Sequence, residues 1–200
     1  MRLLLGTRNP GKVKEITTIL EDSGWTFSSL QEFDDVGPAA EDGVTYAENA
    51  IAKARFYAAA TGLSALADDS GLEVVALGGA PGVYSARYAG DNASDSDRRE
   101  LLLAELAKVD GRDRRARFVA AVAIATPDGE ILNLSEGICS GTITFEPRGN
   151  SGFGYDPLFV PDGYNQTFAE LSDEVKNRIS HRARALMRIR DSLDHLPPPS

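Results

Sequence analysis

Short apolar runs and longer amphipathic stretches follow one another along this chain, an order typical of an α/β protein. The apolar runs are bounded by glycine, proline or polar residues and have the length of buried strands. These predicted strands cover residues 2–6, 25–29, 63–67, 72–77, 118–125 and 131–134. The turn Pro127-Asp128-Gly129 joins the last two into a β-hairpin, and apolar positions between 138 and 145 indicate that the sheet continues.

The amphipathic stretches repeat apolar residues every three or four positions, which is the period of a helix. They predict helices at residues 14–20, 45–60 and 94–108, and a last helix that starts near 172 or 180 and ends at 193. Thr45 and Glu48 form a capping box at the start of the second helix. Alanines recur along that helix, so we expect it to pack closely against a sheet.

The size and composition indicate one folded domain. With 200 residues, 42% of them hydrophobic, the chain is long enough for one well-buried domain, which can have two lobes. We assign residues 1–196 to this domain and expect the tail 197–200 to be disordered. No apolar run is long enough to cross a membrane, and the first one is too short for a signal peptide. We therefore expect no membrane partner.

Charge and cysteine content exclude several classes of partner. The net charge of −9 argues against binding to polymeric nucleic acid, which requires a basic surface. A small nucleotide is still compatible, because its phosphates need only a local group of cations. One cysteine, Cys139, excludes an internal disulfide and fits a cytoplasmic location. With only two histidines besides, a zinc cage is not expected, so carboxylates are the expected metal ligands.

The segment from Ala65 to Gly71 combines an apolar run with two adjacent carboxylates, Asp68 and Asp69. Adjacent aspartates repel each other unless a cation lies close by. Carboxylate oxygens suit Mg²⁺ or Mn²⁺, and ligands of open α/β sheets bind at strand ends. We predict that the strand ends here in a tight turn at Gly71 that keeps both carboxylates at its end. A solvated turn is an equally good interpretation, because Asp, Ser and Gly are common turn residues.

A polar loop that connects the first strand to the first helix can bind phosphate, because helix N-termini have unpaired N–H groups. The loop consists of Thr7, Arg8, Asn9, Pro10, Gly11 and Lys12. Residues 6–12 also fit the glycine and lysine positions of a P-loop, but Val13 stands where a magnesium-binding Ser or Thr belongs. An ordinary strand-to-helix connection and a P-loop NTPase both stay open as alternatives.

Two further segments have the residues of a nucleotide pocket. The glycine-rich segment 149–157 contains Phe153, whose ring can stack on a base. Lys176, His181 and Arg182 lie near the start of the last helix, where an anion or a polar base edge can dock. Lys53 becomes a phosphate-binding or catalytic group if it faces the two aspartates. A nucleoside triphosphate with Mg²⁺ would satisfy all of these segments.

Six motifs stand in an order that resembles one known family. They are Thr7-x-Asn9-x-x-Lys12, Glu41-Asp42-Gly43-x-Thr45-x-x-Glu48-Asn49-Ala50-x-x-Lys53-Ala54, Ala67-Asp68-Asp69-Ser70-Gly71-Leu72, Gly79-Ala80-Pro81-Gly82-x-Tyr84-Ser85-Ala86-Arg87, Gly152-Phe153-Gly154-Tyr155-Asp156-Pro157 and Ile179-Ser180-His181-Arg182. The chain resembles the non-canonical purine nucleoside triphosphate pyrophosphatases over residues 2 to about 195. That family hydrolyses inosine and xanthosine triphosphates and their deoxy forms to the monophosphate and pyrophosphate.

The resemblance implies a long mixed twisted β-sheet flanked by helices, two lobes around a central cleft, a homodimer, and Mg²⁺ as cofactor. It implies that Glu41 and Asp69 bind the metal, that Asp69 also activates water with support from Asp68, and that Lys53 neutralises phosphate charge. The implied substrate contacts are Thr7, Arg8, Asn9, Pro10, Gly11, Lys12, Ser70, Phe153, Gly154, Tyr155, Asp156, Lys176, His181 and Arg182. Asp68, Asp69 and Glu41 are expected to meet around one divalent ion.

Hydrogen-bonding capacity suggests how the base is selected. Arg182 has only donors, so it can pair with the 6-keto oxygen of hypoxanthine or xanthine but not with the 6-amino group of adenine. Guanine also has a 6-keto group, so this argument does not explain its rejection. Two other functions are compatible with the residues: a P-loop-like NTPase that releases orthophosphate, and a nucleotide-binding module without activity.

Overall fold

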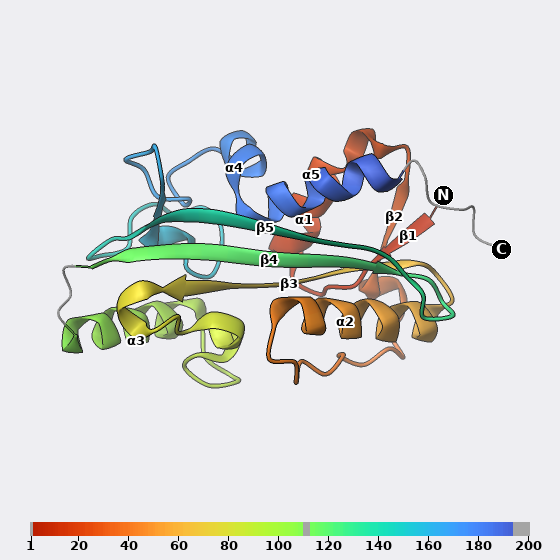
Figure 1. Ribbon diagram of the computed structural model, residues 1–200, viewed down its shortest axis with the longest axis horizontal. Coiled ribbons are helices and arrows are strands. Elements are labelled where there is room, and N and C mark those ends of the chain that lie inside the picture. The colour runs from red at the N-terminus through yellow and green to blue at the C-terminus, as the bar shows by residue number, and fades with distance from the viewer. Residues whose placement is uncertain (1, 110–112, 194–200) are drawn as a thin grey trace. The chain divides into compact units, whose positions relative to one another are not determined.

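The computed structural model of the protein describes residues 2–109 and 113–193 (Figure 1). The described strands are β1 (Arg2–Leu5), β2 (Thr26–Ser29), β3 (Ala65–Val74), β4 (Arg115–Ala125), β5 (Ile131–Ile143) and β6 (Phe159–Pro161). The described helices are α1 (Pro10–Ile19), α2 (Tyr46–Thr61), α3 (Asp95–Lys108), α4 (Asp173–Ile179) and α5 (His181–Leu193). The predicted tail 197–200 lies outside the described residues.

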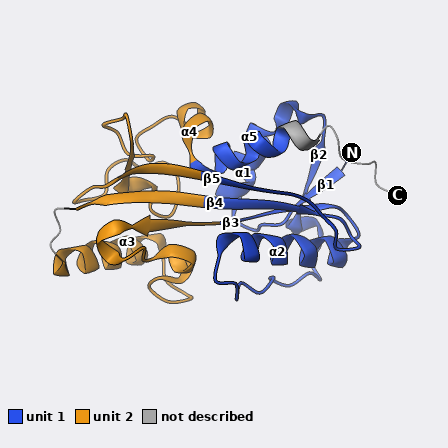
Figure 2. Ribbon diagram, in the orientation of Figure 1, with its two compact units in different colours: residues 1–69, 120–137, 181–200 blue, residues 70–119, 138–180 orange. Residues whose placement is uncertain are grey.

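The six strands form a mixed sheet in the order β2-β1-β3-β4-β5-β6. β1 runs parallel to both β2 and β3, whereas β5 and β6 are antiparallel. The predicted mixed sheet with flanking helices is therefore confirmed. Two compact units divide the chain: unit 1 contains residues 2–69, 120–137 and 181–193, and unit 2 contains the other described residues (Figure 2).

The core of unit 1 covers both faces of its strands. Leu3, Leu4 and Leu5 of β1 are all buried, as expected for a parallel strand with helices on both sides. α1 and α5 lie on one side of these strands and α2 on the other (Figure 1). Three alanines of α2 are fully buried at four-residue intervals, Ala50, Ala54 and Ala58. Their small side chains allow the close approach of α2 that the sequence predicts.

The core of unit 2 contains a group of aromatic rings among aliphatic side chains. The ring of Phe118 lies 4.8 Å from that of Phe159 and 6.0 Å from that of Phe168, measured between centroids. Leu102 and Leu106 of α3 pack into the same cluster. These leucines are four residues apart and therefore lie on one face of the helix. This apolar face, which the sequence predicts, packs α3 against the core.

Two helix boundaries differ from the sequence prediction. α1 begins at Pro10 rather than at residue 14, because the Asn9 side chain caps the helix by accepting hydrogen bonds from the N–H groups of Gly11 and Lys12. Proline is also well suited to the first helical position. The last helix is two helices, α4 and α5, which meet at Ser180. Both of the predicted start points are therefore helix starts.

β3 is one continuous strand from Ala65 to Val74, so the predicted pair of strands with a tight turn at residues 68–71 is wrong. Gly71 does not have a positive φ. Aspartates favour turns when water solvates them. Here Asp68 and Asp69 are paired with buried cations, which removes the reason for the strand to end.

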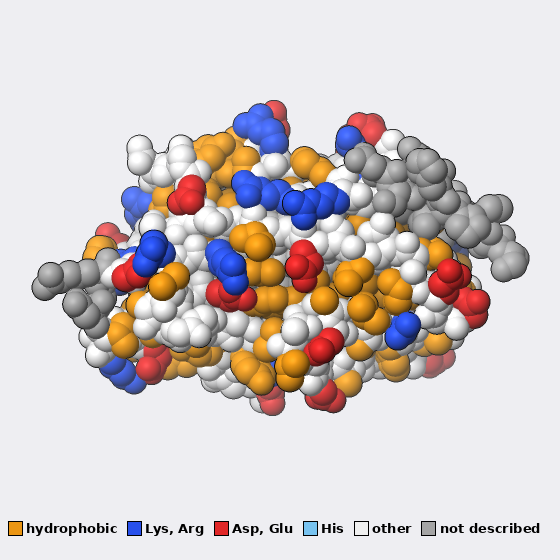
Figure 3. Space-filling model, in the orientation of Figure 1, with side chains coloured by type: hydrophobic (Ala, Val, Ile, Leu, Met, Phe, Trp, Pro, Cys, Tyr) orange, Lys and Arg blue, Asp and Glu red, His pale blue; other side chains and the backbone are white. Residues whose placement is uncertain are grey.

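The surface carries mixed charge. On the face drawn in Figure 3, Lys and Arg side chains are interspersed with Asp and Glu side chains. Within residues 2–109 and 113–193, no helix combines the length and the apolar character that crossing a membrane requires.

We predict that Gly137→Ala destabilises unit 1. A Cβ at Gly137 of β5 would lie 2.1 Å from the carbonyl oxygen of His181 and 2.6 Å from the backbone nitrogen of Ala185. Both contacts are to the backbone of α5, so relief requires movement of the helix. The free energy of unfolding, measured by urea denaturation, should fall by about 3 kcal/mol, the upper end of the usual overpacking range.

Gly37→Ala is the matched control, because a Cβ at Gly37 would meet no atom within 4 Å. Its free energy of unfolding should stay close to that of the wild type. Equal stabilities for the Gly137→Ala variant and this control would contradict the close approach of β5 and α5.

Candidate functional site

Asp68 and Asp69 lie in the middle of β3, beside the carboxyl end of the parallel strand β1. β1 ends at Leu5, which is paired with Leu66 of β3, and the N–H group of Gly6 donates to the carbonyl oxygen of Leu66 at 2.7 Å. The two aspartates therefore lie just beyond the end of β1. Their exposed fractions are only 2% and 6%. Carboxyl ends of parallel strands are the usual ligand-binding edge of α/β sheets.

The two adjacent carboxylates point to opposite faces of β3, as successive side chains of a strand do. On the face of α1 and α5, Asp68 lies 3.0 Å from Lys12 Nζ and accepts a 3.0 Å hydrogen bond from Arg182 Nε. On the face of α2, Asp69 accepts hydrogen bonds from Lys53 Nζ at 2.8 Å and from Asn49 Nδ2 at 3.1 Å. Each aspartate thus has its own cation.

Glu41 lies with Asp69 rather than with Asp68. Lys53 Nζ donates to Glu41 Oε1 at 2.8 Å and to Asp69 Oδ1 at the same distance, so one ammonium group lies between two carboxylates. In the protein alone Asp68 faces the other side of the strand, so only Glu41 and Asp69 share a partner, Lys53. The convergence of all three acids on one ion stays a prediction. Among the described residues, no group of three or more His, Cys, Asp or Glu side chains is placed to hold a metal ion.

The ionisation of these groups is governed by burial and by their partners. Burial opposes ionisation of Asp68, but Lys12, Arg182 and Lys53 outweigh it and hold the pKa of this carboxyl well below its ordinary value of 3.8. Burial also disfavours the Lys53 ammonium, yet Asp69, Asp68 and Glu41 raise its pKa. The pKa of Arg182 is raised against the effect of burial by Asp68 and Glu15. All three side chains are therefore charged at neutral pH.

Two contacts of the site were missed by sequence reasoning. Glu15 of α1, with an exposed fraction of 8%, accepts a hydrogen bond from Arg182 Nη1. Asn49 of α2 is buried, accepts from the N–H group of Gly43 at 2.8 Å and donates to Asp69. Glu15 follows Lys12 by three positions, so the two share a helix face; that spacing was the available signal. We call Lys12, Glu15, Glu41, Lys53, Asp68, Asp69 and Arg182 the charged cluster.

The predicted phosphate loop is held by its own side chains. Thr7 Oγ1 accepts from the N–H group of Asn9 at 3.2 Å, and Arg8 donates to the carbonyl oxygen of Val36 at 2.6 Å. The N–H groups of Gly11 and Lys12, which would cradle phosphate in a P-loop, donate to Asn9 Oδ1 at 2.9 and 3.1 Å. Lys12 is the member of this loop that joins the charged cluster.

A second set of predicted residues comes together in unit 2. Lys176 Nζ of α4 lies 2.5 Å from Asp156 Oδ2 and 4.8 Å from the centroid of the Phe153 ring. The same Asp156 oxygen accepts from the N–H group of Phe153 at 2.9 Å. Asp156 and Lys176 are both buried, and their contacts hold the Phe153 ring against the ammonium group of Lys176. We call residues 149–156 the Phe153 loop.

The other predicted residues are divided between the units. Tyr155 is buried and donates from its hydroxyl to the carbonyl oxygen of Ser85 at 3.0 Å. Gly154 has φ +59°, and Ser70 lies in the unit 2 part of β3. His181 is the first residue of α5 and is buried in unit 1. Of the residues predicted around the base, His181 and Arg182 belong to unit 1, and Ser70, Lys176 and the Phe153 loop to unit 2.

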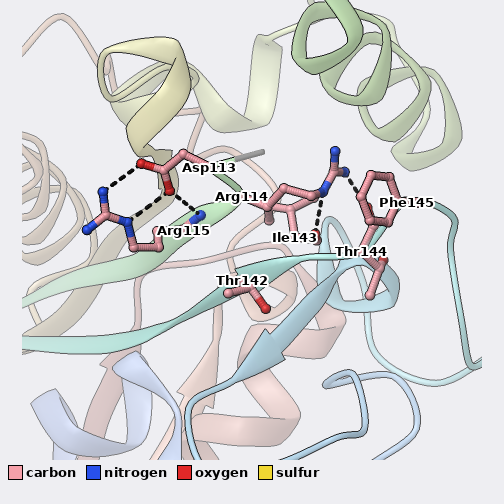
Figure 4. Close-up of a pocket in the computed structure, with 7 residues that line it drawn as sticks. All are labelled: Asp113, Arg114, Arg115, Thr142, Ile143, Thr144 and Phe145. Carbon is pink, nitrogen blue, oxygen red and sulfur yellow. Dashed lines mark hydrogen bonds and ion pairs between the residues drawn. The ribbon is translucent and has the colours of Figure 1, made fainter. Parts of the chain in front are cut away.

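A surface pocket elsewhere in unit 2 contains no predicted site residue (Figure 4). Its lining residues are Asp113, Arg114, Arg115, Thr142, Ile143, Thr144 and Phe145. Arg114 donates to the carbonyl oxygens of Ile143 and Thr144 and lies over the Phe145 ring, whereas Arg115 binds Asp113. None of the seven belongs to a motif that predicts the site, so the ligand is not assigned to this pocket.

Comparison with known proteins gives a family match over most of the chain. The model of the Ham1 family matches residues 3–192. A dITP/XTP pyrophosphatase of Thermus thermophilus is 49% identical over 199 residues, which is 100% of this chain and 95% of that protein. A dITP/XTP pyrophosphatase of Geobacter sulfurreducens is 50% identical over 192 residues, with 96% of each chain covered.

Solved structures give the same result. A HAM1 protein from Coxiella burnetii superposes with a TM-score of 0.88 at 41% identity, over 98% of this chain and 100% of that one. A nucleoside-triphosphatase / dITP/XTP pyrophosphatase from Mycobacterium abscessus gives a TM-score of 0.74 at 44% identity, over 94% and 98% of the two chains.

We predict that Asp68→Asn lowers the free energy of unfolding by about 3–5 kcal/mol at pH 7, because it leaves Lys12 and Arg182 buried without their common carboxylate. The pKa of Asp68 is lowered in the folded state, so its stabilisation is fully present above its ordinary value of 3.8 and is lost as the pH falls through the folded-state value. The stability difference between wild type and variant should therefore be constant above about pH 5 and shrink in acid.

Urea denaturation across this pH range is the measurement. Asp113→Asn is the control, because Asp113 pairs with Arg115 in an exposed ion pair, which contributes little. A stability of Asp68→Asn equal to that of this control at pH 7 would refute the charge pairing.

Proposed function

This chain belongs to the Ham1 family, and from that membership we propose that it hydrolyses the triphosphates of deaminated purines, namely ITP, dITP and XTP. The products are the nucleoside monophosphate and pyrophosphate, so the reaction removes deaminated purines from the nucleotide pool. The observation that carries the proposal is the charged cluster beside the carboxyl end of β1, with Lys12 and Lys53 on either side of the paired aspartates of β3.

The charge of the cluster supports a substrate that arrives with a metal ion. Its cations are Lys12, Lys53 and Arg182, and its carboxylates are Glu15, Glu41, Asp68 and Asp69. Four carboxylates outweigh three cations, so a triphosphate alone would add anions to a site that is already negative. A divalent cation that enters with the nucleotide offsets part of this negative charge, because it attracts both sets of oxygens.

Glu41 and Asp69 have the chemistry to hold that ion, and we propose Mg²⁺. Magnesium in nucleotide sites is usually bound by one or two carboxylates together with substrate phosphates and water. Both carboxylates contact Lys53 Nζ, so they already lie on either side of one positive charge. When bound, Mg²⁺ polarises phosphate oxygens and stabilises the charge that develops in the transition state.

Each residue of the charged cluster then has its own role in positioning the triphosphate or the attacking water. Lys53 and Lys12 neutralise the triphosphate, and Asp69 accepts the proton of a water molecule that attacks the α-phosphorus. Phosphoryl transfer of this kind needs positioning and charge neutralisation rather than a covalent nucleophile. Asp68 takes the supporting role, because its ion pairs hold Lys12 and Arg182 in place.

The base is assigned to the Phe153 loop and to the residues predicted around it. Lys176 lies over one face of the Phe153 ring, and we assign the stacking of the purine to the other face. The pairing of Arg182 with a 6-keto oxygen stays a prediction from the resemblance; its guanidinium group binds Asp68 and Glu15 in the protein alone. A homodimer and a cytoplasmic location are proposed on the same resemblance.

We predict that the protein, incubated with ITP or XTP and Mg²⁺, releases pyrophosphate and the monophosphate, and that ATP and GTP are poorer substrates. Asp69→Asn should lower kcat by at least about 100-fold, the usual contribution of a general base. Chelation of Mg²⁺ should abolish turnover. Product analysis by ³¹P NMR distinguishes pyrophosphate from orthophosphate.

Asp35→Asn is the matched control, since Asp35 is an exposed acid of the loop before Glu41. Its kcat should equal that of the wild type. Orthophosphate released from ATP or GTP would instead support the P-loop alternative, and tight ITP binding without any product would support a binding module. Full activity of Asp69→Asn would remove Asp69 from the catalytic residues.

A further inference from the structure

The start of α3 holds the Phe153 loop through the backbone of a single residue. Asp95 Oδ2 accepts a hydrogen bond from the N–H group of Gly154 at 2.6 Å. Arg99, one helical turn later, donates from Nη1 to the carbonyl oxygen of the same Gly154 at 2.8 Å. Neither Asp95 nor Arg99 belongs to the motifs that predict the site, and both contacts lie within unit 2.

These two bonds fix the conformation of Gly154. Its N–H group belongs to the peptide plane shared with Phe153, and its carbonyl group belongs to the plane shared with Tyr155. When both planes are held, the dihedral angles of the glycine between them are determined. This constraint matters because Gly154 has φ +59°, and glycine loses more conformational freedom on ordering than any other residue.

The same bonds complete the control of Phe153. The peptide plane before Phe153 is held by its own N–H group, which donates to Asp156 Oδ2 at 2.9 Å. The plane after Phe153 is held by Asp95 through the N–H group of Gly154. Both flanking planes are thus fixed, so the direction of the Cα–Cβ bond of Phe153 is fixed as well. The ring at the end of this bond then lies 4.8 Å, measured from its centroid, from Lys176 Nζ.

We propose that Asp95 and Arg99 are positioning residues that set the orientation of the Phe153 ring for the purine base. This inference rests on the proposed function, which assigns the base to Phe153. Neither side chain contacts the nucleotide in this proposal. Each acts through Gly154, so their loss should weaken nucleotide binding rather than the chemical step.

The support of α3 itself explains why it can act as an anchor. Ser94 and Asp97 form a capping box at its first turn. Arg98 donates to the carbonyl oxygens of Ala86 at 2.8 Å and Ala93 at 2.7 Å and binds Asp95. The anchor is thereby connected to the segment 82–87, a motif that the proposed function otherwise leaves without a role.

A second connection joins that motif to the Phe153 loop. The Tyr155 hydroxyl donates to the carbonyl oxygen of Ser85 at 3.0 Å, and Ser85 Oγ accepts from the N–H group of Leu72 at 2.9 Å. The loop is therefore tied to α3 and to β3 by separate bonds. Burial opposes ionisation of Asp95, but bonds from Arg98 and Gly154 lower its pKa, so the acceptor is an anion at neutral pH.

The first measurement is amide hydrogen exchange without nucleotide. In Asp95→Ala the N–H group of Gly154 loses its acceptor, and its exchange should accelerate by about tenfold, the equivalent of ~1.4 kcal/mol for a charge-assisted hydrogen bond. Asp95→Asn should restore slow exchange, because its amide oxygen can accept the same bond. Unchanged exchange in Asp95→Ala would overturn the anchor.

The second measurement is steady-state hydrolysis of ITP. Asp95→Ala and Arg99→Ala should each raise KM by about tenfold and change kcat by less than about twofold, because only binding depends on the ring. Phe153→Ala sets the reference. Combining Asp95→Ala with Phe153→Ala should give no KM increase beyond that of Phe153→Ala, since one residue acts through the other.

Asp97→Ala is the matched control for helix stability, because it removes the capping box of α3 without touching Gly154. Its KM and its Gly154 exchange should equal those of the wild type. Three outcomes would overturn the inference. The KM effects could be additive in the double variant, or kcat could fall as much as KM rises. Asp97→Ala could also raise KM as much as Asp95→Ala does. If the wild-type protein releases no pyrophosphate from ITP, the proposed function is overturned instead. The hydrogen-exchange measurement would still test whether Asp95 holds the N–H group of Gly154.

Discussion

The ion pairing of Asp68 and Asp69 within a central strand is the interaction on which unit 1 depends. Two adjacent buried carboxylates would be costly alone, because burial raises the free energy of each charge. β3 accommodates them because its pleat separates them: Asp68 meets Lys12 and Arg182 on one face, and Asp69 meets Lys53 on the other. Three helices, α1, α2 and α5, are thereby tied to one strand beside the carboxyl end of β1.

This pairing links stability to function. Buried ion pairs contribute little net stability compared with apolar residues of the same size, but they are expensive to break. Lys53, held between Glu41 and Asp69, keeps a positive charge between the two carboxylates that we propose as metal ligands. In unit 2 the Phe153 loop is rich in glycine, so its backbone conformation has to be fixed by other residues. Hydrogen bonds made by Asp95, Arg99 and Asp156 fix it.

The sequence predicts those features that depend on local physics. The capping box at Thr45, the alanine face of α2 and the apolar run of β1 follow from helix capping and periodicity, and the structure confirms them. Lys53 also faces the aspartates, which is the condition under which the sequence predicts a phosphate-binding or catalytic role for it. The continuity of β3 was missed, because an isolated Asp-Asp-Ser-Gly segment resembles a turn until its distant cations are known. Glu15 was missed for the same reason: its partner, Arg182, is 167 residues away.

The most direct test of the account is the binding of Mn²⁺, a paramagnetic substitute for Mg²⁺, titrated by electron paramagnetic resonance in the presence of a non-hydrolysable ITP analogue. If Glu41 and Asp69 hold the metal, as we propose, Glu41→Gln and Asp69→Asn should each weaken Mn²⁺ binding by at least about tenfold, a change of ~1.4 kcal/mol. Asp35→Asn should bind as the wild type does. Wild-type affinity in both site variants would contradict the assignment of the charged cluster as the metal–triphosphate site.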